Sequence, residues 1–194
     1  FDNTLCTYDL VQGCTDQAAC NYSADAEEDD NSCTYAATGF NCDGTCASGL
    51  SAITITLMDS GDGWEGYSYT PYLTVGGVDY TMPQGSWGSM TTMDFAACVD
   101  MSVCQEVFYT IGSYYGENSW SISDADGNVL NTGDGTVGLC NGDAAAYGDV
   151  CSAGLFGGCV TACGDDTANN YNAAADIFDN TLCTYDLVQG CTDQ

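Results

Sequence analysis

The sequence contains no lysine, no arginine and no histidine, although it carries 28 aspartate and glutamate residues. An average chain of this length would contain roughly two dozen Lys and Arg. Without cationic side chains the protein cannot neutralise phosphates, which excludes nucleic acid as a partner and, by the same sign of charge, an anionic membrane surface. The formal charge of −28 needs a counter-charge from outside the chain, and divalent metal is the obvious source.

Other features are missing as well. There are only two prolines, no visible signal peptide and no apolar run of the length that a membrane span needs. No Cys-x-x-Cys pair occurs and histidine is absent, which argues against a four-ligand zinc site. Only carboxylates are left to act as acid and base, and no pair of them stands out from the acidic background. We therefore expect no enzyme activity.

What is present argues against a disordered acidic chain. Hydrophobic residues make up 45% of the sequence, and there are 14 cysteines. One repeat, residues 1–177, contains 12 of them, an even number that leaves out Cys183 and Cys191. Cysteines at this density indicate disulfides formed in an oxidising environment, so we expect a secreted, extracellular or cell-surface protein.

One stretch occurs twice. Residues 1–17 and residues 178–194 both read FDNTLCTYDLVQGCTDQ, at an offset of 177 residues. A fixed period predicts a tandem array whose identical units meet head to tail, with the sequence beginning inside one repeat. The alternative is a closed domain with a duplicated end. The expected parts are the tail of a motif begun in the preceding repeat (1–12), a Cys/Asp motif with its NCDGTC linker (13–46), a β-sandwich (47–135), Gly/Cys-rich stapled loops (136–162), a second Cys/Asp motif (163–185) and the start of the next repeat (186–194).

The two Cys/Asp motifs are copies of each other. Residues 13–35 read GCTDQAACNYSADAEEDDNSCTY and residues 162–185 read ACGDDTANNYNAAADIFDNTLCTY, with one extra residue, Leu182, in the second copy. Each copy is too short for a hydrophobic core, so we expect its first and last cysteines to be cross-linked, a loop closure worth about 3 kcal/mol. The expected pairs within the chain are Cys14–Cys33 and Cys163–Cys183, with Cys20 bonded to Cys42 or Cys46. Across repeats, Cys6 would bond the preceding Cys163, and Cys191 the following Cys33.

The middle of the chain has the pattern of a mostly β domain. Ile53, Ile55 and Leu57 alternate with more polar residues, which predicts a half-buried strand. Two runs around Gly76-Gly77 predict a hairpin. Short strands at this spacing predict an antiparallel β-sandwich or jelly roll. Cys98 and Cys104 flank one short connection and are candidates for a bridge across it. The two runs of the expected hairpin are 67–75 and 78–82. Further strands are expected at 89–97, 105–111, 119–123 and 129–131.

The motif GCTDQAACNYSADAEEDDNSCTY resembles a Cys/Asp tandem motif of large secreted and surface proteins of aquatic bacteria and algae. It is also similar to the calcium-wrapped repeats of thrombospondin type 3, and NCDGTC fits the same pattern. LMDSGDGWEGYSY and ENSWSISDADG resemble a β-domain that accompanies these motifs. The second copy departs from the pattern, with CGDD for the GCTD start and Asn169 for the middle cysteine. The resemblance implies a modular adhesive or structural protein that binds calcium.

The acidic residues of both motifs are also candidates for calcium ligands on chemical grounds, because calcium prefers carboxylate and amide oxygens. The spacing is not that of an EF-hand. An alternative is that these Asp and Asn side chains cap turns. Asp59 and Asp62, in the DSGDGW stretch, could form a third site. The candidate ligands in the two motifs are Asp16, Asn21, Glu27, Asp30, Asp165, Asn170, Asp176 and Asp179.

The function that these observations favour is a structural subunit of a calcium-stabilised, disulfide-rich extracellular fibre. A second hypothesis is a tandem adhesin or carbohydrate-binding module, in which Trp64, Trp87 and Trp120 form a sugar-binding face. The alternative for these tryptophans is that they pack in the core of the sandwich or cover its edges.

Overall fold

The computed structural model describes residues 9–64, 69–85, 88, 91–136 and 146–186. The chain divides into two units, Phe1–Leu50 and Ser51–Gln194, which are treated separately below. In the described ranges, no helix has the length and apolar character that crossing a membrane would require.

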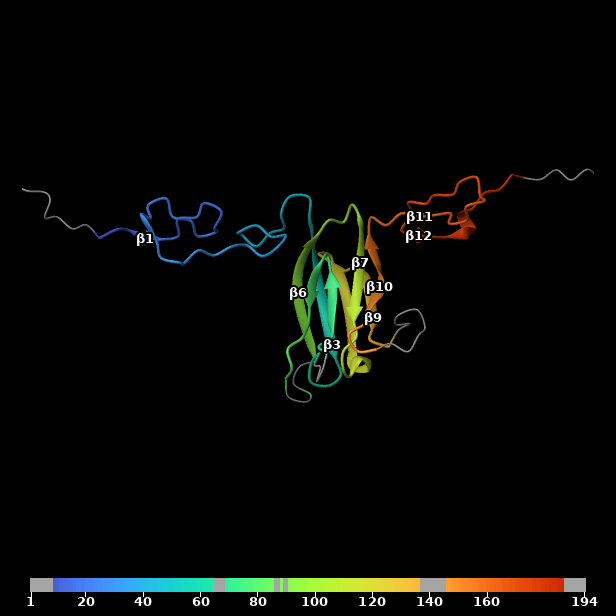
Figure 1. The fold of residues 1–194 in the computed structure, drawn as a ribbon, viewed down its shortest axis with the longest axis horizontal. Coiled ribbons are helices and arrows are strands. Elements are labelled where there is room, and N and C mark those ends of the chain that lie inside the picture. The colour runs from blue at the N-terminus through green and yellow to red at the C-terminus, as the bar shows by residue number, and fades with distance from the viewer. Residues whose placement is uncertain (1–8, 65–68, 86–87, 89–90, 137–145, 187–194) are drawn as a thin grey trace, which may run out of the picture. The chain divides into compact units, whose positions relative to one another are not determined.

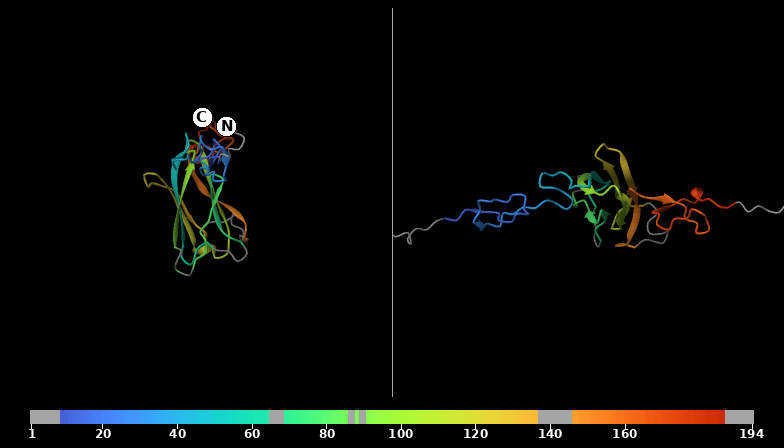
Figure 2. Two further views of the ribbon diagram at one scale, coloured as in Figure 1. Left: turned by 90° about the vertical axis from the view of Figure 1, so that its left-hand side faces the viewer. Right: turned by 90° about the horizontal axis from the view of Figure 1, so that it is seen from above.

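The second unit contains two four-stranded antiparallel sheets that share one hydrophobic core (Figure 1). The first sheet has the order β6-β3-β8-β9 and the second the order β10-β7-β4-β5. Figure 2 shows the two sheets as separate layers. This arrangement confirms the expected antiparallel β-sandwich. The strands of the first sheet are β3 (Ser51–Asp59), β6 (Thr92–Val99), β8 (Asn118–Asp124) and β9 (Val129–Asp134), and those of the second are β4 (Tyr72–Val75), β5 (Val78–Tyr80), β7 (Cys104–Thr110) and β10 (Val150–Gly157).

Strand β3 shows why these residues form a sandwich. Ile53, Ile55 and Leu57 are 3%, 0% and 0% exposed, whereas the residues between them are half-buried. Successive side chains of a strand point to opposite faces, so the alternation puts all three on the core side. The prediction made for this segment is confirmed. Their neighbours in the core include Trp120 and Ile122 of β8 and, from the facing sheet, Leu73, Val107 and Tyr109.

The predicted hairpin is also confirmed. β4 and β5 pair as far as Val75 and Val78, and only Gly76 and Gly77 lie between them. Both glycines have a positive φ, 59° and 78°, which is the backbone conformation that a two-residue hairpin turn requires. Glycine adopts this conformation at no steric cost, so these two residues set the register of the strand pair.

Two expectations for the sandwich are wrong. The stretch 136–162, expected to be stapled loops, contains β10, which pairs with β7 at the edge of the second sheet. Its alternation is hidden by small residues and by a bulge between Ser152 and Leu155. Cys98 and Cys104 do not bridge each other, because Cys104 is bonded to Cys159. β6 and β7 belong to different sheets, so the connection between these cysteines crosses from one layer to the other.

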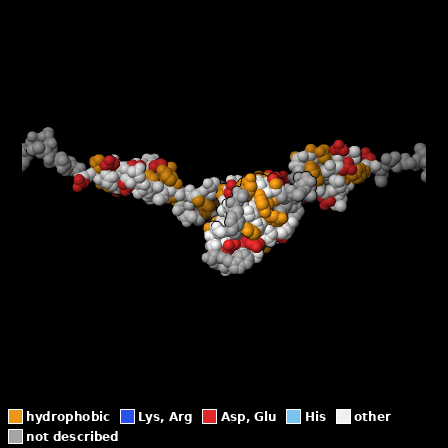
Figure 3. Space-filling model, turned by 60° about the horizontal axis from the view of Figure 1, so that its bottom comes forward, with side chains coloured by type: hydrophobic (Ala, Val, Ile, Leu, Met, Phe, Trp, Pro, Cys, Tyr) orange, Lys and Arg blue, Asp and Glu red, His pale blue; other side chains and the backbone are white. Residues whose placement is uncertain are grey.

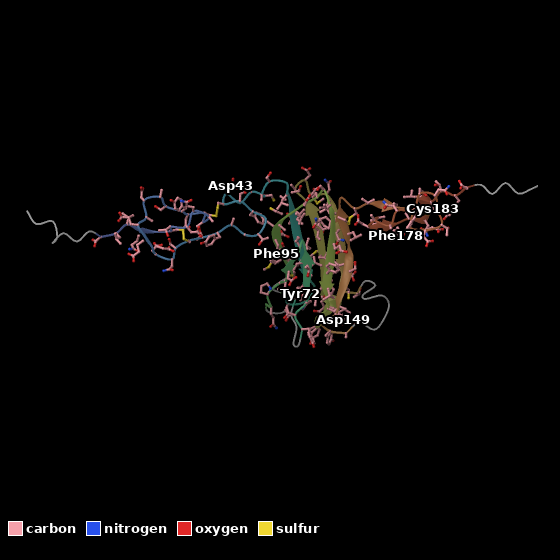
Figure 4. The ribbon with its side chains drawn as sticks, turned by 45° about the horizontal axis from the view of Figure 1, so that its top comes forward. Asp43, Tyr72, Phe95, Asp149, Phe178 and Cys183 are labelled. Atoms are coloured by element: carbon pink, nitrogen blue, oxygen red, sulfur yellow. A yellow bond between two sulfur atoms is a disulfide. The ribbon has the colours of Figure 1, made fainter. Side chains whose placement is uncertain are left out.

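Each Cys/Asp motif forms a small fold around a pair of short parallel strands. In the first motif β1 (Gln12–Gly13) pairs with β2 (Glu28–Asp29), and in the second β11 (Thr161–Ala162) pairs with β12 (Ile177–Phe178). The disulfides Cys14–Cys33 and Cys163–Cys183 are formed as expected. Cys20 bonds Cys42, which decides between its two candidate partners. Figure 4 marks Phe178 of β12 and Cys183 within the second motif.

The two motifs accommodate their single difference in length locally. The extra residue of the second copy, Leu182, lies in a short 3-10 helix, η4 (Asn180–Leu182). Asp179 caps η4, since its side chain accepts a hydrogen bond from the Thr181 N–H. In the first copy, the equivalent Asp30 accepts from the Ser32 N–H without such a helix. The insertion therefore leaves the closing disulfide in place.

Candidate functional site

The side chains expected to bind metal in the two motifs have structural hydrogen bonds instead of a shared centre. In the first copy, the Asn21 side chain donates to the Ser32 carbonyl at 2.7 Å and accepts from the Thr34 N–H at 2.8 Å. In the second, Asn170 makes the same two bonds, to Leu182 and Thr184, both at 2.8 Å. Each asparagine thus ties the middle of its motif to the closing segment.

Asp16 and Asp165 have equivalent roles at the first turn of each motif. Asp16 Oδ1 accepts from the Ala18 N–H at 2.9 Å, and its Oδ2 accepts from the hydroxyl of Tyr35 at 2.7 Å. The Oδ1 of Asp165 likewise accepts from Thr167, and its Oδ2 accepts from the hydroxyl of Tyr185 at 2.6 Å. Each aspartate caps a turn and anchors the last tyrosine of its motif.

The remaining candidate ligands hold the motif strands together. Glu27 accepts from the Val11 N–H at 3.4 Å, and Asp176 accepts from the Val160 N–H at 2.7 Å. The structure describes both motifs, 13–35 and 162–185, in full. In neither of them do three carboxylates lie close enough together to share an ion. The turn-capping interpretation therefore accounts for the positions of these residues, and calcium binding by the motifs stays a prediction.

The hydrogen bonds shift the pKa of the paired groups in opposite directions. The pKa of Asp16 is lowered, chiefly by the Ala18 N–H and then by Tyr35, and the pKa of Asp165 is lowered chiefly by Tyr185. The pKa of Tyr35 and that of Tyr185 are raised, chiefly because each hydroxyl donates to its aspartate. The ionised aspartate and the neutral tyrosine thus stabilise each other.

A different acidic group is brought together at one end of the sandwich. One carboxylate oxygen each from Asp59, Asp62 and Glu117 lie within 4.8 Å of one another. This is the one such group of three or more metal-ligating side chains in the described part of the chain. Acidic side chains gather at this end of the sandwich in Figure 3. The structure thus places Asp59 and Asp62 together, as the sequence suggested, and adds Glu117.

Strand pairing explains why Glu117 joins the two aspartates. Asp59 ends β3 and is the register partner of Asn118, the first residue of β8. Glu117 is the last residue of the 3-10 helix η2 (Tyr115–Glu117), directly before β8, and its carbonyl accepts from the Ser60 N–H at 3.1 Å. Glu117 could not be found from the sequence, because it lies 58 positions after Asp59 and the pairing of β3 with β8 is not visible in the sequence.

Asp59 is the buried member of the group. It is 6% exposed, and its Oδ1 accepts from the Gly61 N–H at 2.6 Å and from the Gly63 N–H at 3.1 Å. Its Oδ2 is buried and makes no hydrogen bond with any described residue. Gly63 has φ of 110°, and a Cβ there would lie 2.5 Å from the Pro83 carbonyl oxygen, so only glycine fits at this position. The loop therefore holds Asp59 in one orientation.

Buried aromatic residues pack close to this loop. Trp64 is 1% exposed, donates to the Met58 carbonyl at 2.9 Å and packs edge-on against Tyr109, with ring centroids 5.7 Å apart. Burial raises the pKa of Tyr109, whose hydroxyl accepts from Asn118, and the negative charge of Asp59 raises it further. Asp59 is thus buried close to apolar, well-packed aromatic residues.

Trp64 and Trp120 do not contribute to the sugar-binding face considered from the sequence. Trp64 and Trp120 are 1% and 2% exposed and belong to the core, which confirms the packing alternative for both. Trp87 lies outside the described residues, as do Cys6, Cys140 and Cys191. The bonds expected for Cys6 and Cys191 between repeats stay predictions.

All described cysteines are disulfide-bonded, including Cys46, Cys98 and Cys151. Such a set of disulfides indicates an oxidising environment. The chain is therefore a disulfide-rich β-sandwich protein with two small Cys/Asp motifs. Comparison with protein-family models, with curated proteins and with solved structures finds no match for it.

Proposed function

We propose that this chain is a structural unit of an extracellular, disulfide-stabilised tandem-repeat assembly. The observation that carries the proposal is the identity of residues 1–17 with residues 178–194. In the structure, residues 178–185 close the second motif, where Cys183 bonds Cys163 and Tyr185 reaches Asp165. Residues 1–8 have the same sequence, so in an array they would close the motif of the preceding copy.

The similarity of the two described motifs supports this proposal. Equivalent strands, disulfides and asparagine bridges recur in both copies, although many of the other residues differ. A motif that folds in the same way in two sequence settings depends on its own cross-link and hydrogen bonds more than on its surroundings. Modules of this kind suit a linear chain of repeats, in which each unit needs only its neighbours.

The composition fits a load-bearing extracellular role better than recognition of a ligand. Disulfides persist outside the cell, and the absence of Lys and Arg removes every site at which a trypsin-like protease would cut. Two of the three tryptophans that motivated the carbohydrate-binding hypothesis, Trp64 and Trp120, are buried and cannot stack on a sugar. We therefore favour the structural role over the adhesin.

The test is the intact mass of the natural material after denaturation, measured before and after reduction. An array encoded as one polypeptide predicts a mass that contains several 177-residue units in both conditions. Separate chains linked through the repeated ends predict a large mass that falls to a single unit on reduction. A single unit under both conditions would contradict the proposal and favour a closed domain with a duplicated end.

A further inference from the structure

We propose that Asp59, Asp62 and Glu117 form a calcium-binding site at the end of the β-sandwich. The inference is independent of the proposed assembly, because it concerns residues within one sandwich. It rests on the convergence of the three carboxylates and on the buried, unpartnered oxygen of Asp59.

The unpartnered oxygen indicates that a ligand belongs here. Asp59 Oδ1 is satisfied by two backbone N–H groups, whereas Oδ2 is buried without a hydrogen bond from the described residues. Buried charged groups are normally paired or coordinate a metal, because losing water without compensation is costly. The sequence contains no Lys, Arg or His, so no side chain of this protein can supply the positive charge.

The donor set selects the kind of cation. All three side chains offer carboxylate oxygens, and the group contains neither nitrogen nor sulfur, so it favours a hard cation over zinc or copper. Two oxygens bound to one calcium ion can be at most about 5 Å apart, given bond lengths of roughly 2.3–2.6 Å. The separations within 4.8 Å fall inside this limit.

Calcium suits the site better than magnesium. Asp62 and Glu117 are half-buried, so water can fill the remaining positions around an ion. Calcium accepts six to eight oxygens in a flexible arrangement, whereas magnesium requires a near-octahedral site with shorter bonds. A bound ion would tie the loop after β3 to the segment before β8, adding a link to the Ser60–Glu117 backbone hydrogen bond.

Terbium luminescence offers a test that separates this site from the two motifs. Terbium replaces calcium at oxygen sites and emits when a nearby tryptophan transfers energy to it. Trp64 follows Asp62 by two residues, whereas neither motif, 13–35 or 162–185, contains a tryptophan. Excitation at a wavelength that tryptophan absorbs and tyrosine does not should therefore report the sandwich site alone.

We expect the chelator-treated, full-length protein to give this sensitised emission, and calcium to displace the terbium. Glu117→Gln should weaken terbium and calcium binding at least about tenfold, because it removes one of three charged ligands. Glu106→Gln is the matched control, since Glu106 is an exposed residue of β7 outside the group. Circular dichroism should show that both variants keep the sheet content of the parent protein.

Three results would overturn the inference. The first is the absence of tryptophan-sensitised emission in the parent protein. The second is equal calcium affinity in Glu117→Gln and Glu106→Gln. The third is displacement of terbium by magnesium but not by calcium at equal concentration, which would reject calcium as the ion. Asp62→Asn gives a second variant at a half-buried position, and a loss of affinity in it would support the same site.

Discussion

The β-sandwich and the Cys/Asp motifs are stabilised in opposite ways. The sandwich buries large apolar side chains, including Trp64, Tyr109 and Leu57, between two sheets. In the two motifs, 13–35 and 162–185, which the structure describes in full, the buried hydrophobic residues are only Cys14, Ala19 and their equivalents Cys163 and Ala168. With so little apolar surface to bury, each motif depends on a covalent cross-link and on side chains that satisfy its backbone.

Acidic residues serve different purposes in the sandwich and in the motifs. In the motifs, carboxylates accept hydrogen bonds from backbone N–H groups and tyrosine hydroxyls, so their charge is well solvated or compensated. In the sandwich, Asp59 is buried with one oxygen free of such bonds. The number of carboxylates in a segment is therefore a poor guide to metal binding, whereas an unsatisfied buried oxygen is a useful one.

The largest effect is expected from a cavity in the sandwich. Ile55→Ala should lower the free energy of unfolding of the sandwich by about 2–5 kcal/mol, because Ile55 is fully buried. Chemical denaturation followed by tryptophan fluorescence would measure this change. Val129→Ala, at a position 64% exposed, is the control and should change the stability by less than about 0.5 kcal/mol. Similar losses in both variants would contradict the assignment of the core.

Removing a motif disulfide should have a comparable but local effect. The double variant Cys163→Ser with Cys183→Ser should destabilise the second motif by about 3 kcal/mol, the loop-closure value for this length. Hydrogen exchange would show loss of protection at the Asn169 and Thr184 amides. The first motif, with Cys14–Cys33 intact, is the internal control. If the β3 and β8 amides also lost protection, the two regions would not be stabilised separately.

A smaller effect is expected from the asparagine bridge. Asn170→Ala removes two hydrogen bonds to the backbone and should destabilise the second motif by about 1–2 kcal/mol. Asn169→Ala is a suitable control, because the Asn169 side chain donates to the exposed side chain of Asp186, and the substitution keeps the backbone bond from the Asn169 N–H to Thr184. Exchange rates of the Thr184 amide would compare the two variants. A greater loss in Asn169→Ala would show that the bridge is not what closes the motif.

The smallest effect concerns pH. Hydrogen bonding lowers the pKa of Asp165 below its ordinary 3.8, so its stabilising contribution is fully present above 3.8 and is lost as the pH falls through the lowered value. The raised pKa of Tyr185 gives the opposite case: its contribution is present below pH 10.0 and is lost as the pH rises through the raised value. Tyr185 is exposed and Asp165 is half-buried, so solvent screens their interaction and the changes should be small.

Ultraviolet titration would check the alkaline part of this prediction. The difference between the parent protein and Tyr185→Phe should show a tyrosine that ionises above pH 10.0. In the variant Asp165→Asn the same difference should move down toward the ordinary value, because the negative charge that opposes ionisation is gone. An unchanged midpoint in Asp165→Asn would contradict the role assigned to this hydrogen bond.

Local patterns in the sequence were enough to predict many elements of this protein. The alternation around Ile55, the Gly76-Gly77 turn and the motif disulfides could all be predicted, because each depends on residues close together in the chain. The same holds for the equivalence of the two motifs. Periodicity, turn chemistry and loop closure act over short distances, so they remain visible without a structure.

Long-range pairing was decided only by the tertiary structure. The disulfide between Cys104 and Cys159 requires β7 and β10 to be neighbours, and the acidic group requires Glu117 to lie beside the end of β3. Neither relation follows from spacing, because the order of strands in a sheet depends on how two layers share one core. That packing also decides whether both oxygens of an aspartate accept hydrogen bonds, as in Asp16, or one stays buried without any, as in Asp59.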